Sequence, residues 1–340
     1  MRIKKLVSVV LIFVIGVMTL PCAQGAVNTK SFQKMTFAAS NGVELPYRLY
    51  VPDNVPEDQD IPILTFLHGA GERGNDNELP LSTDCELLNL IVKNPEQYPC
   101  VIVVPQCGDG SQWVDTPWSA GNYSVSDIPM SRYLTAVKEL LVSLEQEYHI
   151  DSSRRYITGL SMGGFGTWDM IMRYPRTFAA ALPICGGADP LQILRLLDLP
   201  IRTYHGNADP IVPVGGTRLI AQMMELYEAP HFSYKEIEGG DHGIWGGIYR
   251  NPETAEWLFS QRRDDALLYW GDIDQDNHIT ATDALLVLQH SVKLTELTYE
   301  DADVADVNAD GTLDAADALA ILQHSVGLID RFQAEGNGTK

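Results

Sequence analysis

The stretch Tyr156 to Trp168, YITGLSMGGFGTW, limits the possible folds of this chain more than any other part of it. The segment Gly159 to Gly163 matches the pattern G-x-S-x-G, in which the glycines allow a sharp strand-to-helix turn that pushes the serine hydroxyl outward. Residues 155–158 before it favour a β-strand, and apolar residues recur at helical spacing over 165–174 after it. We therefore expect Ser161 at the tip of a strand-turn-helix unit, as a candidate nucleophile.

Strand-forming and helical segments alternate through the rest of the first three quarters of the chain. A hairpin is expected over 35–51, around the turn pair Asn41-Gly42. Further strands are expected at 63–67, 101–104, 179–184, 201–204 and 232–237, and helices at 126–149, 191–197, 214–227 and 252–263. This order predicts an α/β fold with a doubly wound, mostly parallel sheet, whose ligands bind beyond the carboxyl ends of the strands.

A serine nucleophile needs a base that takes its proton. His242 is the favoured base, because it lies in the glycine-rich loop 239–243, directly after the last expected strand. His68 and His205 also end strands before a glycine, where a histidine commonly shapes a turn. We therefore expect His242 to face Ser161.

The base in turn needs an acid that orients it. Asp209 follows the strand at 201–204, and Asp189 and Asp241 are its rivals. Asp189 is also suited to starting a helix, and Asp241 adjoins His242 too closely to present its carboxylate easily to that ring. The order Ser161, Asp209, His242 is the order expected of an α/β-hydrolase.

Three tryptophans, Trp113, Trp118 and Trp245, lie in expected loops. They either pack beneath those loops or offer a platform for a sugar ring or an aromatic acyl group. Trp245 is the first candidate for substrate binding, because it is close in sequence to His242.

The N-terminus has the features of a secretory signal peptide over residues 1–25. The basic residues Arg2, Lys4 and Lys5 precede an apolar run at 6–20 and the small residues of Ala23-Gln24-Gly25. The apolar run is shorter than the roughly 20 residues needed to span a bilayer, so a membrane anchor is not favoured. We expect a secreted, extracellular protein with no membrane segment in its mature form.

Cleavage would remove Cys22 and leave four cysteines, Cys85, Cys100, Cys107 and Cys185. Their spacing does not distinguish between the three possible pairings and free thiols.

The C-terminal segment contains an internal repeat with a period of 34 residues. Asp283-Ala284-Leu285 and Leu288 to Val292 recur as Asp317-Ala318-Leu319 and Leu322 to Val326. In each repeat, oxygen-bearing side chains fall at positions one, three, five and twelve, the spacing of an EF-hand-like calcium loop. The expected ligands of two structural Ca²⁺ ions are Asp272, Asp274, Asp276 and Asp283, then Asp306, Asn308, Asp310 and Asp317, with backbone carbonyls from His278 and Thr312.

The same segment carries much of the negative charge. The chain has a formal charge of −21, and residues 264–331 hold fifteen Asp or Glu against Lys293 and Arg331. A nucleic-acid partner is therefore not expected.

Residues 35–263 resemble the secreted esterase and predicted-peptidase branch of the α/β-hydrolase superfamily, which is related to feruloyl esterases and has a prolyl-oligopeptidase-like fold. The resemblance is carried by Leu67 to Gly74, Pro105 to Cys107, Gly159 to Gly164, Pro183 to Gly187, His205 to Asp209 and His242 to Trp245. It implies the triad Ser161, Asp209 and His242, with an oxyanion hole formed by the backbone N–H groups of Ala70 and Met162. Together with the dockerin resemblance described next, which narrows the substrate class more, it implies a serine ester hydrolase that acts on plant cell-wall polysaccharide, removing feruloyl groups or the acetyl groups of xylan. A serine peptidase and a catalytically inert binding module remain alternatives.

The C-terminal repeat resembles a type I dockerin, the module that anchors enzymes to scaffoldin cohesins in a cellulosome. Asn277 stands where the loop usually has glycine, and Asp283 and Asp317 stand where an ordinary EF-hand has glutamate. The resemblance implies a cohesin partner, contacted by Leu288 with Gln289 or by Leu322 with Gln323.

These features divide the chain into a signal peptide (1–25), an esterase domain (31–263), a dockerin (268–331) and a C-terminal tail (332–340). The join at 264–270 lacks a Pro/Thr-rich linker, so we expect the two domains to be closely coupled.

Overall fold

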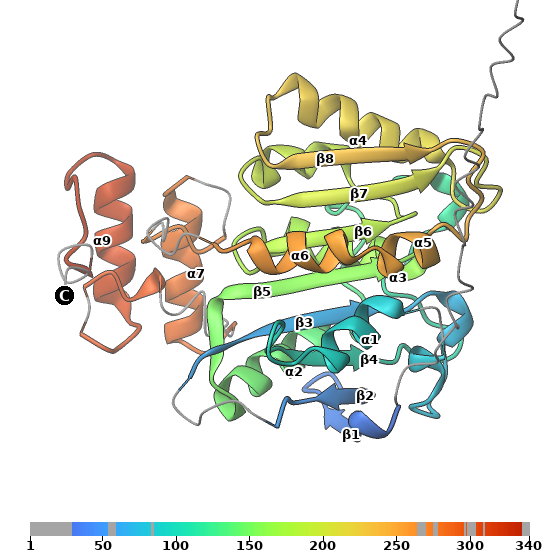
Figure 1. Cartoon of the computed structure of the whole chain (residues 1–340). Coiled ribbons are helices and arrows are strands. Elements are labelled where there is room, and N and C mark those ends of the chain that lie inside the picture. Colours follow the sequence, from blue (N-terminus) through green and yellow to red (C-terminus); the bar gives the residue numbers. More distant parts are fainter. Residues whose placement is uncertain are drawn as a thin grey trace, which may run out of the picture.

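An eight-stranded sheet forms the centre of the larger part of the molecule (Figure 1). The computed structural model describes residues 29–53, 59–82, 85–263, 270–274, 278–295, 297, 304–308 and 310–334. The expected signal peptide, as well as Asp276 and Asn277 of the first calcium loop, lies outside these residues.

The strand order is β1-β2-β4-β3-β5-β6-β7-β8. β1 pairs antiparallel with β2 and β2 antiparallel with β4, whereas all pairings from β4 to β8 are parallel. The strands are β1 (Gln33–Ala38), β2 (Glu44–Tyr50), β3 (Ile61–Leu67), β4 (Val101–Pro105), β5 (Ile150–Leu160), β6 (Ala180–Ile184), β7 (Ile201–Gly206) and β8 (Phe232–Ile237). The central strands β3, β4 and β6 are buried along their whole length, as parallel strands covered on both faces should be.

Helices cover both faces of the sheet and create two apolar cores. One core contains side chains of α2 (Arg132–Glu147), α3 (Met162–Arg173), η5 (Pro190–Leu196) and α4 (Val214–Leu226). The other contains side chains of α1 (Glu86–Lys93), α5 (Trp245–Arg250) and α6 (Pro252–Ser260). The remaining short 3₁₀ turns are η1 (Thr29–Ser31), η2 (Ala70–Glu72), η3 (Leu79–Leu81) and η4 (Trp118–Ala120). The doubly wound α/β architecture expected from the sequence is confirmed.

The helix expected from residue 126 begins only at Arg132. Pro129 disfavours helical backbone at the residue before it, and Ser131 caps the helix by accepting the N–H of Leu134 on its hydroxyl at 3.1 Å. The short helices α1 and α5 were not expected. No helix among the described residues is both long enough and apolar enough to cross a bilayer.

A smaller unit with its own apolar core follows the sheet. It contains α7 (Ala281–Ser291) and α9 (Ala315–Ser325), which pack against each other. Figure 1 shows these helices beyond the end of the sheet where β5 and β6 begin. The loops that follow the parallel strands lie at the opposite end.

Candidate active site

Ser161 occupies a strained turn between β5 and α3. Its backbone has φ 54° and ψ −119°, a region that residues with a side chain rarely adopt. The turn is held by a hydrogen bond from the N–H of Ser161 to the carbonyl of Ile184, at 2.9 Å. A Cβ on Gly163 would lie 1.9 Å from the carbonyl oxygen of Leu67, so the pattern needs glycine there. The side chain of Ser161 thus stands at the carboxyl end of β5, where chemistry was expected.

Ser161, His242 and Asp209 form one hydrogen-bonded chain. Oγ of Ser161 lies 2.7 Å from Nε2 of His242, and Nδ1 of His242 lies 2.7 Å from Oδ2 of Asp209. Since a carboxylate only accepts, Nδ1 of His242 carries a proton and Nε2 is free to accept one from the serine. Three residues far apart in sequence therefore meet in the arrangement that nucleophilic catalysis requires.

The Asp209 carboxylate is held in its ionised form. Burial raises the pKa of this group, but hydrogen bonds from His242 and from the N–H groups of Val212 and Ile211 outweigh burial and bring the pKa below its usual range. Both backbone donors reach Oδ1, at 3.0 and 2.8 Å. The carboxylate can consequently stabilise a proton-bearing His242.

The two rival acids have other partners. Asp189 caps η5 by accepting the N–H of Leu191 at 2.9 Å, as expected of a residue that starts a helix. Asp241 accepts the N–H of Gly243 at 2.8 Å, within its own loop. Of the three acids considered, Asp209 is the one hydrogen-bonded to His242.

His68 shapes the loop after β3. Its Nε2 accepts the N–H of Cys107 at 2.9 Å, so its proton lies on Nδ1, which donates to the carbonyl of Gly69 at 2.6 Å. Burial lowers the pKa of His68 to about 4, so the ring is neutral. The carbonyl of His68 accepts the indole N–H of Trp113 at 3.0 Å. The loop that carries Ala70 is therefore fixed from inside the protein.

The expected oxyanion donors flank the serine turn. Met162 is the first residue of α3, directly after Ser161, and Ala70 opens η2 after Gly69. A Cβ on Gly69 would lie 2.8 Å from Cδ1 of Leu160, so this loop packs against the residue before the nucleophile. The two backbone segments thus approach the same turn.

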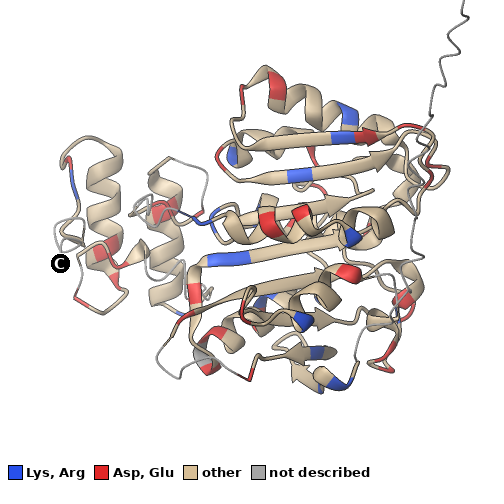
Figure 2. Ribbon diagram, in the orientation of Figure 1, with Lys and Arg blue, Asp and Glu red and all other residues tan. Residues whose placement is uncertain are grey.

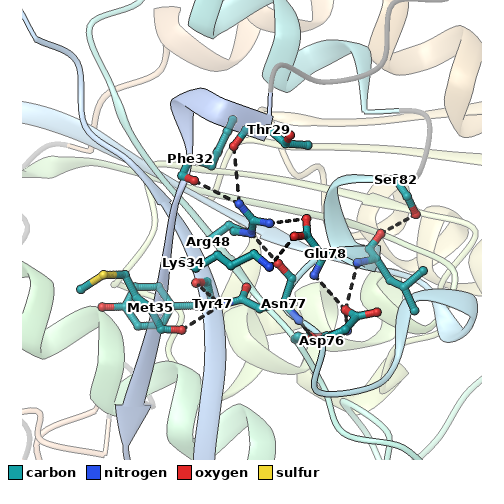
Figure 3. A network of polar contacts seen from close by, with 12 residues as sticks. Thr29, Phe32, Lys34, Met35, Tyr47, Arg48, Asp76, Asn77, Glu78 and Ser82 are labelled. Atoms are coloured by element: carbon teal, nitrogen blue, oxygen red, sulfur yellow. Dashed lines mark hydrogen bonds and ion pairs between the residues drawn. The ribbon is translucent and has the colours of Figure 1, made fainter.

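A buried arginine braces the chain that continues from this loop (Figure 3). Arg48 of β2 donates to the carbonyls of Asn77 and Phe32 and pairs with Glu78, which also pairs with Lys34. The amide of Asn77, a residue with φ 54°, donates to carbonyls of β1 and β2. These contacts fasten residues 76–78 to the first hairpin.

Gln106, directly after β4, completes this brace. Its side chain accepts the N–H of Asn77 at 2.7 Å and donates to the carbonyl of Glu72 and to Asp76, each at 3.0 Å. Neither Arg48 nor Asn77 was singled out from the sequence, because no local pattern marks a residue whose partners lie about thirty positions away. The Pro105-Gln106-Cys107 motif was the one available signal.

The three candidate tryptophans have different environments. The ring of Trp245 meets that of His242 edge-on, with centroids 5.4 Å apart. Trp113 is fully buried beside His68, so its place is in the core rather than at a surface that substrate can reach. Trp118 is partly exposed and has the guanidinium of Arg73 over its ring, 5.8 Å from the centroid. Trp245 and Trp118 are the two that remain accessible.

The four cysteines of the described chain, Cys85, Cys100, Cys107 and Cys185, are free thiols and are buried. Burial raises the pKa of Cys107 and of Cys185 to about 12, so both remain neutral. The spacing of the cysteines left open three disulfide pairings and free thiols, and the structure has free thiols at all four positions.

The first repeat loop gathers carboxylates at the start of α7. Oxygens of Asp272, Asp274 and Asp283 lie within 4.8 Å of one another. Asp283 is buried and accepts the N–H groups of Ile273 and Asp274 on Oδ1, at 2.7 and 3.0 Å. His278 follows the part of this loop that is outside the described residues. This cluster of hard oxygen donors suits Ca²⁺.

The second loop repeats the arrangement before α9. Asp306 accepts the N–H groups of Asp310 and Gly311, while Asp310 accepts that of Thr312 at 2.8 Å. Burial raises the pKa of Asp317, and the neighbouring charges of Asp306 and Asp310 raise it further. Crowded carboxylates of this kind are stabilised by a bound cation. Asn308 also lies in this loop and donates its N–H to Asp317.

The first loop also contacts the sheet-bearing part of the chain. Arg176, in the turn before β6, pairs with the carboxylate of Asp272, and Arg195 of η5 donates to the carbonyl of Asp274 at 2.8 Å. Figure 2 shows acidic residues around α7 and α9. The close coupling expected from the short join therefore has a physical basis, in which arginines of one unit meet acidic loop residues of the other.

The profile of the family described as "Putative esterase" matches residues 38–290 of this chain. The chain belongs to this esterase family. The profile of the type I dockerin domain matches residues 270–324, so the esterase domain is followed by a dockerin. Both resemblances seen in the sequence are confirmed.

Named relatives fit this family assignment. A solved structure described as a thermostable esterase is 38% identical, with a TM-score of 0.63, and the match covers 69% of this chain and 64% of that one. A bifunctional acetylxylan esterase/xylanase of Neocallimastix patriciarum is 26% identical over 181 residues, 52% of this chain and 23% of that protein. Poly(3-hydroxyalkanoate) depolymerase C of Paucimonas lemoignei is 44% identical over 52 residues, 15% of this chain and 13% of that protein. The esterase thus spans less than a quarter of these two curated relatives.

The Arg48 brace can be tested by replacing, one at a time, the two basic side chains that pair with Glu78, Arg48 and Lys34. Arg48→Leu leaves the buried carbonyls of Asn77 and Phe32 without a donor, and such a group costs about 1–3 kcal/mol. Lys34 is half exposed, and an exposed ion pair contributes at most about 1 kcal/mol. We expect Arg48→Leu to lower the urea midpoint clearly more than Lys34→Leu does. Equal effects would show that the brace is only a surface ion pair.

Proposed function

We propose that this protein is a secreted serine esterase that hydrolyses carboxylic esters on plant cell-wall polysaccharide through a covalent acyl-enzyme. The observation that carries the proposal is the unbroken chain from Oγ of Ser161 through His242 to Asp209, with both contacts at 2.7 Å. The family assignment supports ester hydrolysis.

In the first half of the reaction, Ser161 attacks the carbonyl carbon of the ester while Nε2 of His242 takes the hydroxyl proton. The backbone N–H groups of Ala70 and Met162 donate to the oxyanion of the tetrahedral intermediate, and one such donor is worth roughly 3 kcal/mol. His242 then gives its proton to the leaving sugar oxygen, and the acyl group stays on Ser161.

In the second half, water replaces the sugar. His242 takes a proton from that water, which attacks the acyl carbonyl, and the acid product leaves as Oγ of Ser161 regains its proton. Asp209 keeps the ring oriented and stabilises its charged form throughout. None of these steps requires a metal ion or another cofactor.

The acyl group is proposed to be acetyl or feruloyl. The similarity to a bifunctional acetylxylan esterase/xylanase supports an acetylated xylan substrate. The accessible rings of Trp245, beside His242, and of Trp118, near Ala70 through Arg73, supply apolar faces on which a sugar or a feruloyl ring could stack.

Activity on methyl ferulate, acetylated xylan and a peptide amide tests the proposal directly. We expect hydrolysis of at least one of the two esters and almost none of the amide, and we expect Ser161→Ala to abolish it while the melting temperature is retained. Hydrolysis of the amide alone would indicate a peptidase, and no hydrolysis of any would indicate an inert module. A Ser161→Ala variant that kept more than a few per cent of turnover would exclude the acyl-enzyme.

We further propose that the dockerin holds two structural Ca²⁺ ions and binds a scaffoldin cohesin, which would place the esterase in an extracellular cellulosome. The ions would be held by the two sets of loop residues given above, of which Asp276 lies outside the described residues. The charge of each ion would offset the repulsion between loop carboxylates, and this is its role in the fold.

Chelation tests the calcium assignment. Because the ligands of each loop come together only in the folded state, we expect EGTA to unfold residues 268–331, as seen by loss of helical circular dichroism and of a separate calorimetric transition. Hydrolysis of a soluble ester should persist, since the triad contains no metal. Unchanged spectra after complete chelation would contradict the assignment.

The proposed cohesin surface is duplicated. Leu288 and Leu322 are each 41% exposed, and Val292 and Val326 are 62% and 63% exposed. The two helices therefore present nearly the same apolar face, so a single cohesin site could accept either repeat, in orientations related by a pseudo-twofold rotation. Lys293 in one repeat stands where Gly327 stands in the other, so the two orientations can differ in affinity.

Paired substitutions test this redundancy. We expect modest losses of cohesin affinity when Leu288 and Gln289 are changed to alanine, or Leu322 and Gln323, and a collapse only when all four are changed. The measurement is calorimetric titration with an isolated cohesin in calcium. Collapse from one pair alone would show a single binding face.

A further inference from the structure

We propose that His205 is a positioning residue for the active site, which steadies the Asp209 carboxylate at the oxygen that His242 also contacts. His205 is the second-to-last residue of strand β7 and is fully buried, as is the side chain of Asp209. Its Nε2 is 3.2 Å from Oδ2 of Asp209, the same oxygen that accepts the Nδ1 proton of His242 at 2.7 Å. Oδ2 of Asp209 thus faces one nitrogen of each imidazole ring. The inference rests on the proposed role of Asp209 as the triad acid.

The surroundings of His205 allow one protonation state. Nε2 faces two acceptors, Oδ2 of Asp209 and the carbonyl of Val212 at 3.1 Å, so Nε2 carries the proton. Nδ1 lies 2.7 Å from Oγ1 of Thr217, whose hydroxyl can donate to it. Burial lowers the pKa of His205, so the ring remains neutral. The Nε2 N–H of His205 therefore hydrogen-bonds the carbonyl of Val212 and places its partial positive charge beside Oδ2 of Asp209.

The other groups facing this cluster do not replace that donor. Cys185, at the end of β6, offers its sulfur to the same buried cluster, but its thiol is neutral and is only a weak donor. Asp241 is acidic and cannot donate when ionised. The carbonyl of Gly186 accepts the Thr217 hydroxyl only as a longer alternative, at 3.2 Å.

The two oxygens of Asp209 therefore have different partners. Oδ1 accepts the backbone N–H groups of Ile211 and Val212, whereas Oδ2 is hydrogen-bonded to His242 and lies 3.2 Å from Nε2 of His205. Without His205, the one N–H group beside Oδ2 among the described residues would belong to His242, whose protonation changes during each turnover. The His205 donor fixes the plane of the carboxylate and moderates its basicity in both protonation states of His242.

Two substitutions of His205 distinguish an N–H donor from a ring that only fills space. In His205→Gln the amide nitrogen can reach the position of Nε2, whereas in His205→Asn it reaches only the position of Nδ1. We expect His205→Gln to keep kcat within about threefold, and His205→Asn to lose about tenfold in kcat with little change in KM, because the N–H group beside the charged carboxylate is lost. In His205→Asn the acid limb of kcat/KM should also move to higher pH, because the less solvated carboxylate binds a protonated His242 more strongly.

A second variant covers the case in which His205→Asn fails to fold. Thr217→Val keeps the shape of the side chain but removes the hydroxyl that faces Nδ1, so the ring can take its other tautomer. We expect a smaller loss in kcat, of about threefold, at unchanged KM, and a shift of the acid limb in the same direction. All variants are made in the full chain, and their melting temperatures are measured in parallel.

Equal losses in His205→Gln and His205→Asn, or an unmoved acid limb in both His205→Asn and Thr217→Val, would overturn the proposal. Asp209→Asn distinguishes this failure from a failure of the proposed triad. A large loss in Asp209→Asn beside equal His205 variants would leave the triad standing and reject only the role of His205. Wild-type turnover in Asp209→Asn would reject both.

Discussion

Backbone packs directly on backbone where α3 leaves the sheet, and the rest of the site depends on this contact. A Cβ on Gly163 would lie 1.9 Å from the carbonyl oxygen of Leu67, and one on Gly164 would lie 2.5 Å from that of Ile184. No side chain fits between the helix and the ends of β3 and β6. This closeness fixes the strained backbone of Ser161 and sets its distance from the loop that follows β3. The position of Ser161 relative to the base, the acid and the oxyanion donors therefore depends on this glycine-lined contact.

The sequence was sufficient for the fold class and for the three residues that form the hydrogen-bonded chain, because each is marked by a local pattern at the end of a strand. It could not assign different roles to His68 and His205, since both stand at the end of an expected strand before a glycine. Their roles differ because of distant partners: His68 binds the backbone of its own loop and of Cys107, whereas His205 reaches Asp209. The brace around Arg48 escaped prediction for the same reason, as do most contacts made by pairs far apart in sequence.

In the dockerin, duplication makes the paired loops and helices readable from the sequence, but not the burial of Phe332 in its core, because Phe332 was assigned to the tail beyond the repeat. Matched positions in the two repeats have matched exposure, and the buried Asp283 and Asp317 cap α7 and α9 in the same way. The contact of the first loop with Arg176 and Arg195 breaks this equivalence. One calcium loop thus faces the esterase, and this difference between two near-identical loops depends on the neighbouring domain rather than on the repeats themselves.

The place of the dockerin, at the end of the sheet where β5 and β6 begin, has a mechanical consequence (Figure 1). Ser161 directly follows the opposite end of β5, so the length of the sheet separates the dockerin from the nucleophile. A cohesin bound to the dockerin would therefore lie at the end of the molecule remote from Ser161, and the loops that carry the catalytic residues would stay open to substrate.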